Sequence, residues 1–186
     1  SNAWAVSAEK SATGRPILCN DTHLVLSMPG VWYLNHLYSE EGFHVIGASL
    51  PGVNGILLGH NKKVAWGITL AFTDVEDIFV EKVNVEDTNT YEYCGENLAF
   101  HIIEETIHIK GKSPHIETIK STVHGPLIGD VSGRENLSIS LSSKTLMEMD
   151  LSSAIYAMNI AQNVHEFSNA IDLIYAPHLN VAYADV

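Results

Sequence analysis

The sequence lacks the features that mark several large classes of protein. It has only two cysteines, Cys19 and Cys94, which form neither a disulfide framework nor a CxxC site, so they leave the redox compartment open. Ten basic residues face 22 acidic ones, and the net charge of −12 gives no electrostatic footprint for nucleic acid or anionic lipid. No apolar run approaches the roughly 20 residues of a membrane-spanning helix. No basic segment followed by an apolar stretch opens the sequence, so we expect no signal peptide here.

What is present has the composition of a folded domain. The 186 residues are 46% hydrophobic and 17% charged, whereas disorder requires low hydrophobicity and high charge density. This length suits one ordinary domain. The last apolar run, Val181 to Val186, is typical of a strand that the end of the sequence interrupts. We therefore expect residues 1–186 to form a single, incomplete domain.

The first hundred residues favour β-structure, because short apolar runs recur between turn signals such as Pro51-Gly52. A hairpin is expected next, with residues 100–109 as one strand and Ile116 to Val123 as the other. The remaining predicted strands are Trp4 to Val6, Ile17 to Cys19, Val31 to Leu37, Val45 to Leu50, Ile56 to Leu58, Val64 to Leu70, and Ile78 to Val83.

Two helices are expected in the residues after Asn136. Helical spacing predicts the first of them, through Leu151, Ile155 and Met158. Asn163 followed by Glu166 is typical of the start of the second, and we expect Pro177 to end it.

Ser1 allows two interpretations. Ser-Asn-Ala is the trio that removal of a purification tag leaves behind, with no function of its own. Alternatively, Ser1 is an N-terminal nucleophile whose hydroxyl is activated by its own α-amino group. The pKa of an α-amine is about 7.7–8.0, far below the roughly 10.4 of lysine, so a useful fraction is uncharged at neutral pH. That fraction can accept the hydroxyl proton as a general base.

Motifs spread over nearly the whole sequence resemble, in their order, the opening of the β-chain of the penicillin acylase family. Members of that family are N-terminal nucleophile amidohydrolases. The likeness is weakest between residues 90 and 120 and between 130 and 150. The motifs are Ser1 to Val6, Gly14 to Leu18, Asn20 to Leu24, Trp32-Tyr33, Ile46 to Ala48, Leu50 to Gly52, Gly59 to Asn61, Ala65 to Gly67, Asp74 to Asp77, His124 to Pro126, and Asn180 to Asp185.

The resemblance implies a fold, partners and a location. The implied fold class is α/β in the broad sense (α+β), with packed sheets flanked by helices, as in the family's αββα sandwich, only part of which fits into 186 residues. Family β-chains run far beyond this length, so we expect the N-terminal portion of one, together with an α-chain from the same precursor. We expect the isolated portion to self-associate through unpaired strands. Exported members act in the periplasm or outside the cell.

The resemblance also implies four catalytic positions and no catalytic cofactor. After autoprocessing, Ser1 would attack an amide carbonyl and form an acyl-enzyme, which water hydrolyses. The backbone N–H of Leu70 and the side-chain amide of Asn180 would stabilise the oxyanion, where losing one donor typically costs on the order of 10²–10³ in rate. His23 would orient the Ser1 hydroxyl or amine by a hydrogen bond. Without the resemblance, Leu70 would be interpreted as a core residue and Asn180 as an edge or turn residue.

Five apolar positions correspond to the family's acyl pocket and favour an aliphatic or aromatic acyl chain over a dicarboxylic one. The only arginines, Arg15 and Arg134, fall at none of them, so this part of the site lacks a bidentate clamp for an acyl carboxylate, which later β-chain residues could still supply. Without the resemblance, all five would be ordinary core residues. They are Leu24, Trp32, Leu57, Leu58 and Phe72.

Asp74 and Asp77, with the carbonyl of Glu76, match a structural calcium site of the family, and oxygen ligands at this spacing suit Ca²⁺. Further ligands would come from the α-chain and from later in the β-chain, so this chain alone is expected to bind calcium weakly or not at all. The plain alternative is a solvated acidic turn. The histidines, among them His101 and His108, show no metal-binding spacing on one predicted element.

Three functions remain open from the sequence. The first is an amidohydrolase that removes the acyl group from a β-lactam side chain, an acyl-homoserine lactone or a related N-acyl compound, with this portion inactive by itself. The second is a non-catalytic fragment or degenerate homologue that serves as a binding or structural β-rich module. The third is an acidic calcium-binding β-module. The identity of Ser1 in the mature protein separates the first from the others.

Overall fold

The computed structural model describes residues 1–129, 133, 137–146 and 149–186, with only the backbone for residue 146. They form two compact units. The first unit combines Ser1–Thr73 with Met147–Val186, and the second is Asp74–Leu146. Arg134 lies outside the described residues. Within the described part, neither helix is long and apolar enough to cross a membrane.

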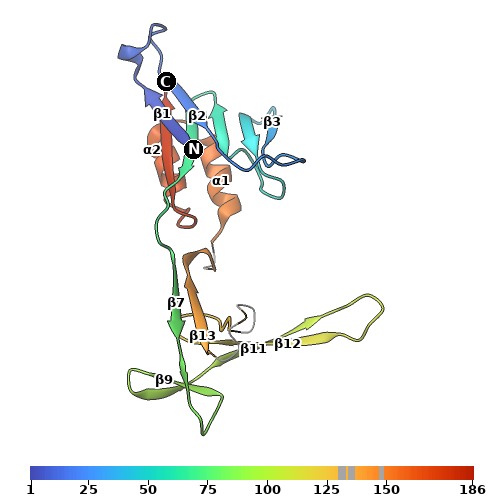
Figure 1. Cartoon of the computed structure of the whole chain (residues 1–186). Helices are drawn as coiled ribbons and strands as arrows, with labels where there is room; N and C mark the ends of the chain where they lie inside the picture. Colours follow the sequence, from blue (N-terminus) through green and yellow to red (C-terminus); the bar gives the residue numbers. More distant parts are fainter. Residues whose placement is uncertain (130–132, 134–136, 147–148) are drawn as a thin grey trace. The chain divides into compact units, whose positions relative to one another are not determined.

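The first unit is built on an antiparallel five-stranded sheet with strand order β14-β6-β5-β4-β3 (Figure 1). A two-stranded hairpin, β1–β2, belongs to the same unit. A short 3₁₀ turn, η1 (Ala8–Lys10), follows β1. The strands are β1 (Asn2–Val6), β2 (Ile17–Asp21), β3 (Tyr33–Tyr38), β4 (His44–Ser49), β5 (Leu58–Asn61), β6 (Val64–Leu70) and β14 (Leu179–Asp185).

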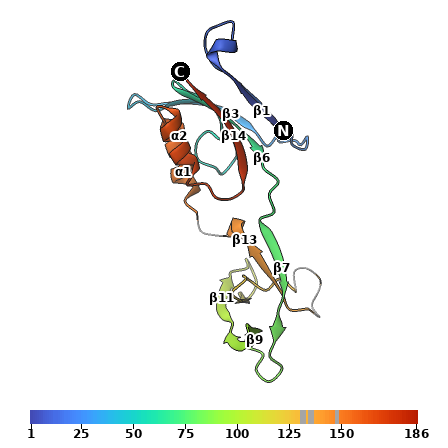
Figure 2. The ribbon, with the colours of Figure 1, turned by 90° about the vertical axis from the view of Figure 1, so that its left-hand side faces the viewer.

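Two helices, α1 (Leu151–Ile160) and α2 (Val164–Ile171), cover one face of this sheet (Figure 2). Each begins at a residue whose side chain accepts a main-chain hydrogen bond, Asp150 for α1 and Asn163 for α2. Trp66 of β6 is buried against Phe167 of α2, with ring centroids 5.3 Å apart. The apolar core of the unit therefore lies between the sheet and the helices.

The β1–β2 hairpin lies on the opposite face of the sheet. Adjacent residues of a strand point to opposite faces, so Gly67 faces away from the side where Trp66 meets the helices. A Cβ placed on Gly67 would lie 2.6 Å from Cβ of Asn20 in β2. The order of layers in this unit is therefore helices, five-stranded sheet and hairpin.

The second unit consists of three small antiparallel sheets, β13-β7, β10-β9-β8 and β11-β12. A 3₁₀ turn, η2 (Lys144–Leu146), follows β13. All seven residues of β11 are exposed, so neither face of this strand contributes a core. The strands are β7 (Glu76–Val80), β8 (Lys82–Val83), β9 (Thr90–Tyr93), β10 (Glu96–Ala99), β11 (His101–Ile107), β12 (His115–Ser121) and β13 (Ile139–Ser143).

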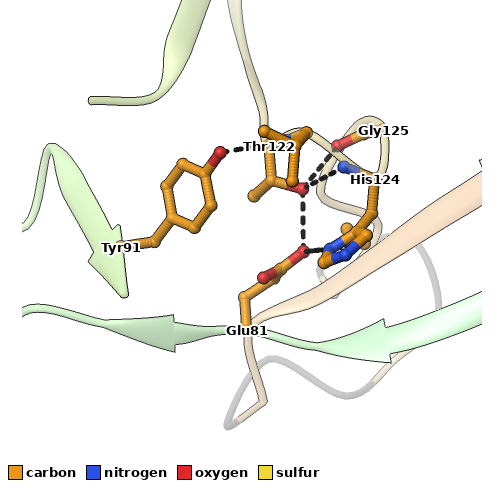
Figure 3. A network of polar contacts seen from close by, with 7 residues as sticks. Glu81, Tyr91, Thr122, His124 and Gly125 are labelled. Atoms are coloured by element: carbon orange, nitrogen blue, oxygen red, sulfur yellow. Dashed lines mark hydrogen bonds and ion pairs between the residues drawn. The ribbon is translucent and has the colours of Figure 1, made fainter. Parts of the chain in front are cut away.

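The second unit contains a buried carboxylate, that of Glu81, and Figure 3 shows the polar groups around it. Oε1 of Glu81 accepts hydrogen bonds from Ser140 Oγ at 2.5 Å and from Thr122 Oγ1 at 2.7 Å, and it lies 2.9 Å from Nδ1 of His124. Burial by itself raises the pKa of Glu81, but these hydrogen bonds outweigh burial and hold the pKa below its ordinary value. The network joins the chain between β7 and β8 to β13 and to the His-Gly-Pro turn.

The structure confirms most predicted elements, corrects the bounds of others and adds strands that the sequence did not predict. The strand predicted over Ile56 to Leu58 begins only at Leu58, because the main chain of Ile56 is bonded to Asn159 of α1. Helix α2 ends at Ile171, six residues before Pro177, in a tighter turn. Strands β9, β10 and β13 were not predicted.

Candidate active site

Ser1 lies at the start of β1 and is bonded to the chain that follows β2. The main-chain N–H of His23 donates to Oγ of Ser1 at 3.2 Å. The His23 ring instead meets Asp21, with Nε2 2.8 Å from Oδ2. The hydrogen bond from His23 to the Ser1 hydroxyl therefore comes from its backbone N–H, while its ring is engaged with Asp21.

Leu70, at the end of β6, directs its N–H away from β14. The N–H of Ala71 bonds to the carbonyl of His178 at 3.2 Å, which makes these two a hydrogen-bonded pair. The neighbouring pair, Leu70 with Leu179, is therefore of the non-hydrogen-bonded kind. On its other side β6 pairs with β5 only as far as Trp66, so the N–H of Leu70 points to an edge that β5 has left.

Asn180 lies on β14 directly opposite Thr69. Its exposed side-chain amide donates to Oγ1 of Thr69 and to the carbonyl of Leu70, both at 3.3 Å. These contacts are long for N–H···O bonds, so little is lost if the amide turns to another acceptor. The two predicted oxyanion donors, Leu70 and Asn180, therefore lie side by side.

Asn20 of β2 links the Ser1 side of this group to the Leu70 side. Its Nδ2 donates to the carbonyls of Asn2 and Ile68, at 3.0 and 3.2 Å, and its Oδ1 accepts from the N–H of Ile68 at 3.1 Å. Sequence reasoning included Asn20 only within a motif. A side chain that binds distant backbone leaves no spacing signal in a sequence.

The five predicted pocket residues differ in how far they are buried. Leu24 and Phe72 expose 45% and 89% of their surfaces, whereas Trp32, Leu57 and Leu58 are partly buried. A cavity of about 450 Å³ in the same unit is lined by other residues, among them Val6, Val164 and Tyr183.

Phe72, near Leu70 in the candidate site, has an unusual backbone conformation. Its φ of 54° is in the left-handed region, which costs a non-glycine residue roughly 1–2 kcal/mol. Such outliers persist only where the surrounding structure maintains them, and they cluster at functional sites. Here the outlier turns the chain two residues after Leu70.

The predicted calcium ligands lie in the second unit. The prediction assigns the Glu76 carbonyl to calcium, and the Glu76 side chain is engaged elsewhere, because its Oε1 accepts from Ser143 Oγ at 2.8 Å. Asp77 is the next residue of β7, opposite Ser142. Among the described residues, no group of three or more His, Cys, Asp or Glu side chains is placed to hold a metal ion. Two carboxylates, Asp74 and Asp77, and one carbonyl fall short of the six to eight oxygens that Ca²⁺ takes.

The family model described as penicillin amidase matches residues 1–186, the whole of the sequence. The chain belongs to the penicillin amidase family. It is 32% identical over 197 residues to acyl-homoserine lactone acylase QuiP of Pseudomonas aeruginosa, an alignment that covers 100% of this chain and 23% of that protein. It is 38% identical over 154 residues to penicillin acylase 2 proenzyme of Pseudomonas sp. strain SE83, with 82% of this chain and 19% of that protein covered.

The fold agrees with this membership of the penicillin amidase family. The structure matches thermostable penicillin G acylase from Alcaligenes faecalis with a TM-score of 0.80 at 27% identity. The match covers 100% of this chain and 33% of that chain. The chain thus spans about a third of that structure and under a quarter of the two curated relatives.

Proposed function

We propose that the whole protein is an acylase that hydrolyses amides, with Ser1 as the terminal residue and nucleophile of its mature β-chain. The observation that carries this proposal is the convergence of three separate segments. Ser1, the backbone edge at Leu70 and the amide of Asn180 are joined through Asn20 and the β6–β14 pair.

The proposed reaction uses groups of this chain only. The uncharged α-amine of Ser1 accepts the proton of Oγ, and Oγ bonds to the amide carbonyl carbon. The N–H of Leu70 and the amide of Asn180 donate to the oxyanion, and the protonated amine returns its proton to the departing nitrogen. Water then attacks the acyl-enzyme and gives a proton to the same amine, which passes it to the departing Oγ of Ser1 as the acid is released.

The relatives suggest the class of substrate. They carry the names acyl-homoserine lactone acylase and penicillin acylase, so we propose an N-acyl compound of either kind. The apolar side chains at Leu24, Trp32 and Phe72 favour an aliphatic or aromatic acyl group. Faster hydrolysis of glutaryl amides than of long-chain or phenylacetyl amides would contradict this assignment.

Partners and location remain proposals as well. We propose that an α-chain from the same precursor and later β-chain segments complete the αββα sandwich, that calcium binds only with their ligands, and that the enzyme acts in the periplasm or outside the cell. Calcium removal is then expected to lower the melting temperature of the whole protein and to leave that of this chain alone unchanged.

The decisive experiment uses the full-length protein. Intact mass should reveal a chain that begins at Ser1, and Ser1→Ala should abolish hydrolysis of acyl-homoserine lactones and of penicillin G. A mature protein that runs uncut through this position leaves the non-catalytic module as the better account. Robust turnover by residues 1–186 alone would contradict the need for the missing segments.

A further inference from the structure

Asn20 takes the place of a neighbouring strand at one point of the sheet. Ile68, like Leu70, is at a non-hydrogen-bonded position toward β14, so its N–H and C=O point to the edge that β5 has left. The Asn20 side chain is partly buried there and bonds to both groups of Ile68. A primary amide has the same donor and acceptor arrangement as a peptide group, so it can pair with a single residue as a strand would.

Gly67 makes room for this pairing. A Cβ at Gly67 would lie 2.6 Å from Cβ of Asn20 and 2.9 Å from its Cγ. Real atoms do not approach so closely, so any larger residue at position 67 must displace the Asn20 amide. This one contact therefore requires both the amide of Asn20 and the absence of a side chain at Gly67.

The second N–H of the Asn20 amide reaches the candidate nucleophile's own segment. It donates to the carbonyl of Asn2, the residue bonded to Ser1. Leu70 lies two residues beyond Ile68 on the same strand edge. One side chain therefore spans from the peptide after Ser1 to the backbone edge that carries the Leu70 N–H.

We propose that Asn20 is a positioning residue, which holds Ser1 in register with the oxyanion donor at Leu70. This inference rests on the proposed function. Asn20 does not touch the reacting atoms in this scheme. Its effect on rate arises because a displacement of about 1 Å between nucleophile and oxyanion donor can cost on the order of 10²-fold.

Asn61 provides a matched control in the same unit. Its Nδ2 also donates to two main-chain carbonyls, those of Asn159 and Ala161, at 3.0 and 2.8 Å. Its Oδ1 accepts from the N–H of Lys63 and Val64. It is partly buried like Asn20, but it joins α1 to the β5–β6 turn and has no link to β1.

The experiment compares Asn20→Leu with Asn61→Leu in the full-length processed protein. Leucine has nearly the shape of asparagine and adds no charge. Active sites are counted by labelling Ser1 with a sulfonyl fluoride. The value of kcat is then calculated per labelled site, so that misfolded molecules do not contribute to it. We expect Asn20→Leu to lower kcat per labelled site on the order of 10²-fold, with KM little changed. Asn61→Leu is expected to lower the number of sites but not kcat per site.

Gly67→Ala tests the same contact if Asn20→Leu does not fold, because it displaces the amide without removing it. It should lower kcat per site in the same direction. Unchanged kcat per site in Asn20→Leu and Gly67→Ala, or an equal fall in Asn61→Leu, would overturn the positioning role.

Hydrogen exchange separates this inference from the proposed function. If the wild-type protein hydrolyses no amide, the acylase proposal fails, but the link can still be measured. Asn20→Leu should speed exchange of the Ile68 amide and loosen residues 2–6, whereas Asn61→Leu should leave both as in the wild type. Unaltered exchange in Asn20→Leu would show that Asn20 does not hold β1 to β6.

Discussion

The first unit joins its strands to helices through an apolar core, whereas the second gathers its strands around a buried carboxylate. Val45, Val64 and Trp66 of the first unit are nearly inaccessible beneath the helices. In the second unit Glu81 and Ser140 are buried together, and β11 is exposed along its length. Helices thus cover the apolar core of the first unit, whereas the second buries a carboxylate together with the apolar side chains of Tyr91, Phe100 and Ile139.

The polar contacts of the two units also differ in type. The first unit uses neutral asparagine amides, and Asn159 repeats the arrangement of Asn20. Its amide bonds to both the N–H and the C=O of Ile56, at 2.8 and 2.7 Å. The residue before Ile56 is again a glycine, whose Cβ would lie 2.8 Å from Asn159 Oδ1. The buried polar side chains of the first unit, Ser49 and Asn159, are therefore neutral, whereas the second unit buries the titratable Glu81.

The largest expected effect is on the apolar core. Phe167→Ala removes a fully buried ring that packs on Trp66 and Tyr183, so it should lower the free energy of unfolding of the first unit by about 3–5 kcal/mol. Hydrogen exchange of the β6 amides in the whole protein measures this loss. Leu26→Ala, at a fully exposed side chain, is the control and should change it by less than about 0.5 kcal/mol. Equal effects of both variants would contradict the core described here.

Next in size is the loss of the buried carboxylate. Glu81→Ala leaves the hydroxyl of Ser140 and the ring N of His124 without their acceptor, and it leaves the Thr122 hydroxyl only a long contact of 3.4 Å to the carbonyl of Gly125. Each unpaired buried group costs roughly 1–3 kcal/mol, so we expect a loss of about 3 kcal/mol. The loss should appear in exchange of β7 and β13 amides, and the β6 amides should exchange as in the wild type. A variant as stable as the wild type would show that the network contributes nothing.

The sequence predicted the elements whose cause is local. Alternating apolar residues mark β6, and the Asn163–Glu166 pair marks the start of α2, where the two residues bond to each other as expected. Strand β13 was missed although Ile139 and Leu141 alternate with serines, which is the period-two pattern of a strand. Its pairing partner is β7, more than 50 residues earlier. Pairing partners at such a distance leave no mark in a short window.

The candidate site was predictable in its members but not in its connections. Motif resemblance named Ser1, Leu70 and Asn180, and the structure places the last two side by side. It did not indicate that His23 would use its backbone N–H, or that Asn20 would join the two halves. Likewise, Glu81 was predicted only as part of the strand expected over Ile78 to Val83, although a carboxylate inside an apolar run indicates a buried polar contact.

The stability of the second unit should depend on pH through Glu81. The pKa of Glu81 lies below its ordinary value of 4.5 in the folded protein, so the unfolded chain binds this proton more tightly. The stability that the charged carboxylate contributes is therefore full above about pH 4.5 and is lost as the pH falls through the lowered folded-state pKa. Exchange of β13 amides at descending pH should show this loss. Glu81→Gln should remove the dependence, and an unaltered dependence in that variant would assign it to another group.

The smallest effect is expected for a second histidine–glutamate pair in the same unit. His115 and Glu117 lie 2.8 Å apart on β12, but each exposes 56% of its side chain, in contrast to the 4% of Glu81. Because water screens exposed ion pairs, Glu117→Gln should change the free energy of unfolding by about 0.5 kcal/mol or less. Exchange of the β11 and β12 amides measures it, with Glu81→Gln as the comparison. If Glu117→Gln lowers the free energy of unfolding as much as Glu81→Gln does, the contribution of Glu81 comes from its charge and not from its burial among three donors.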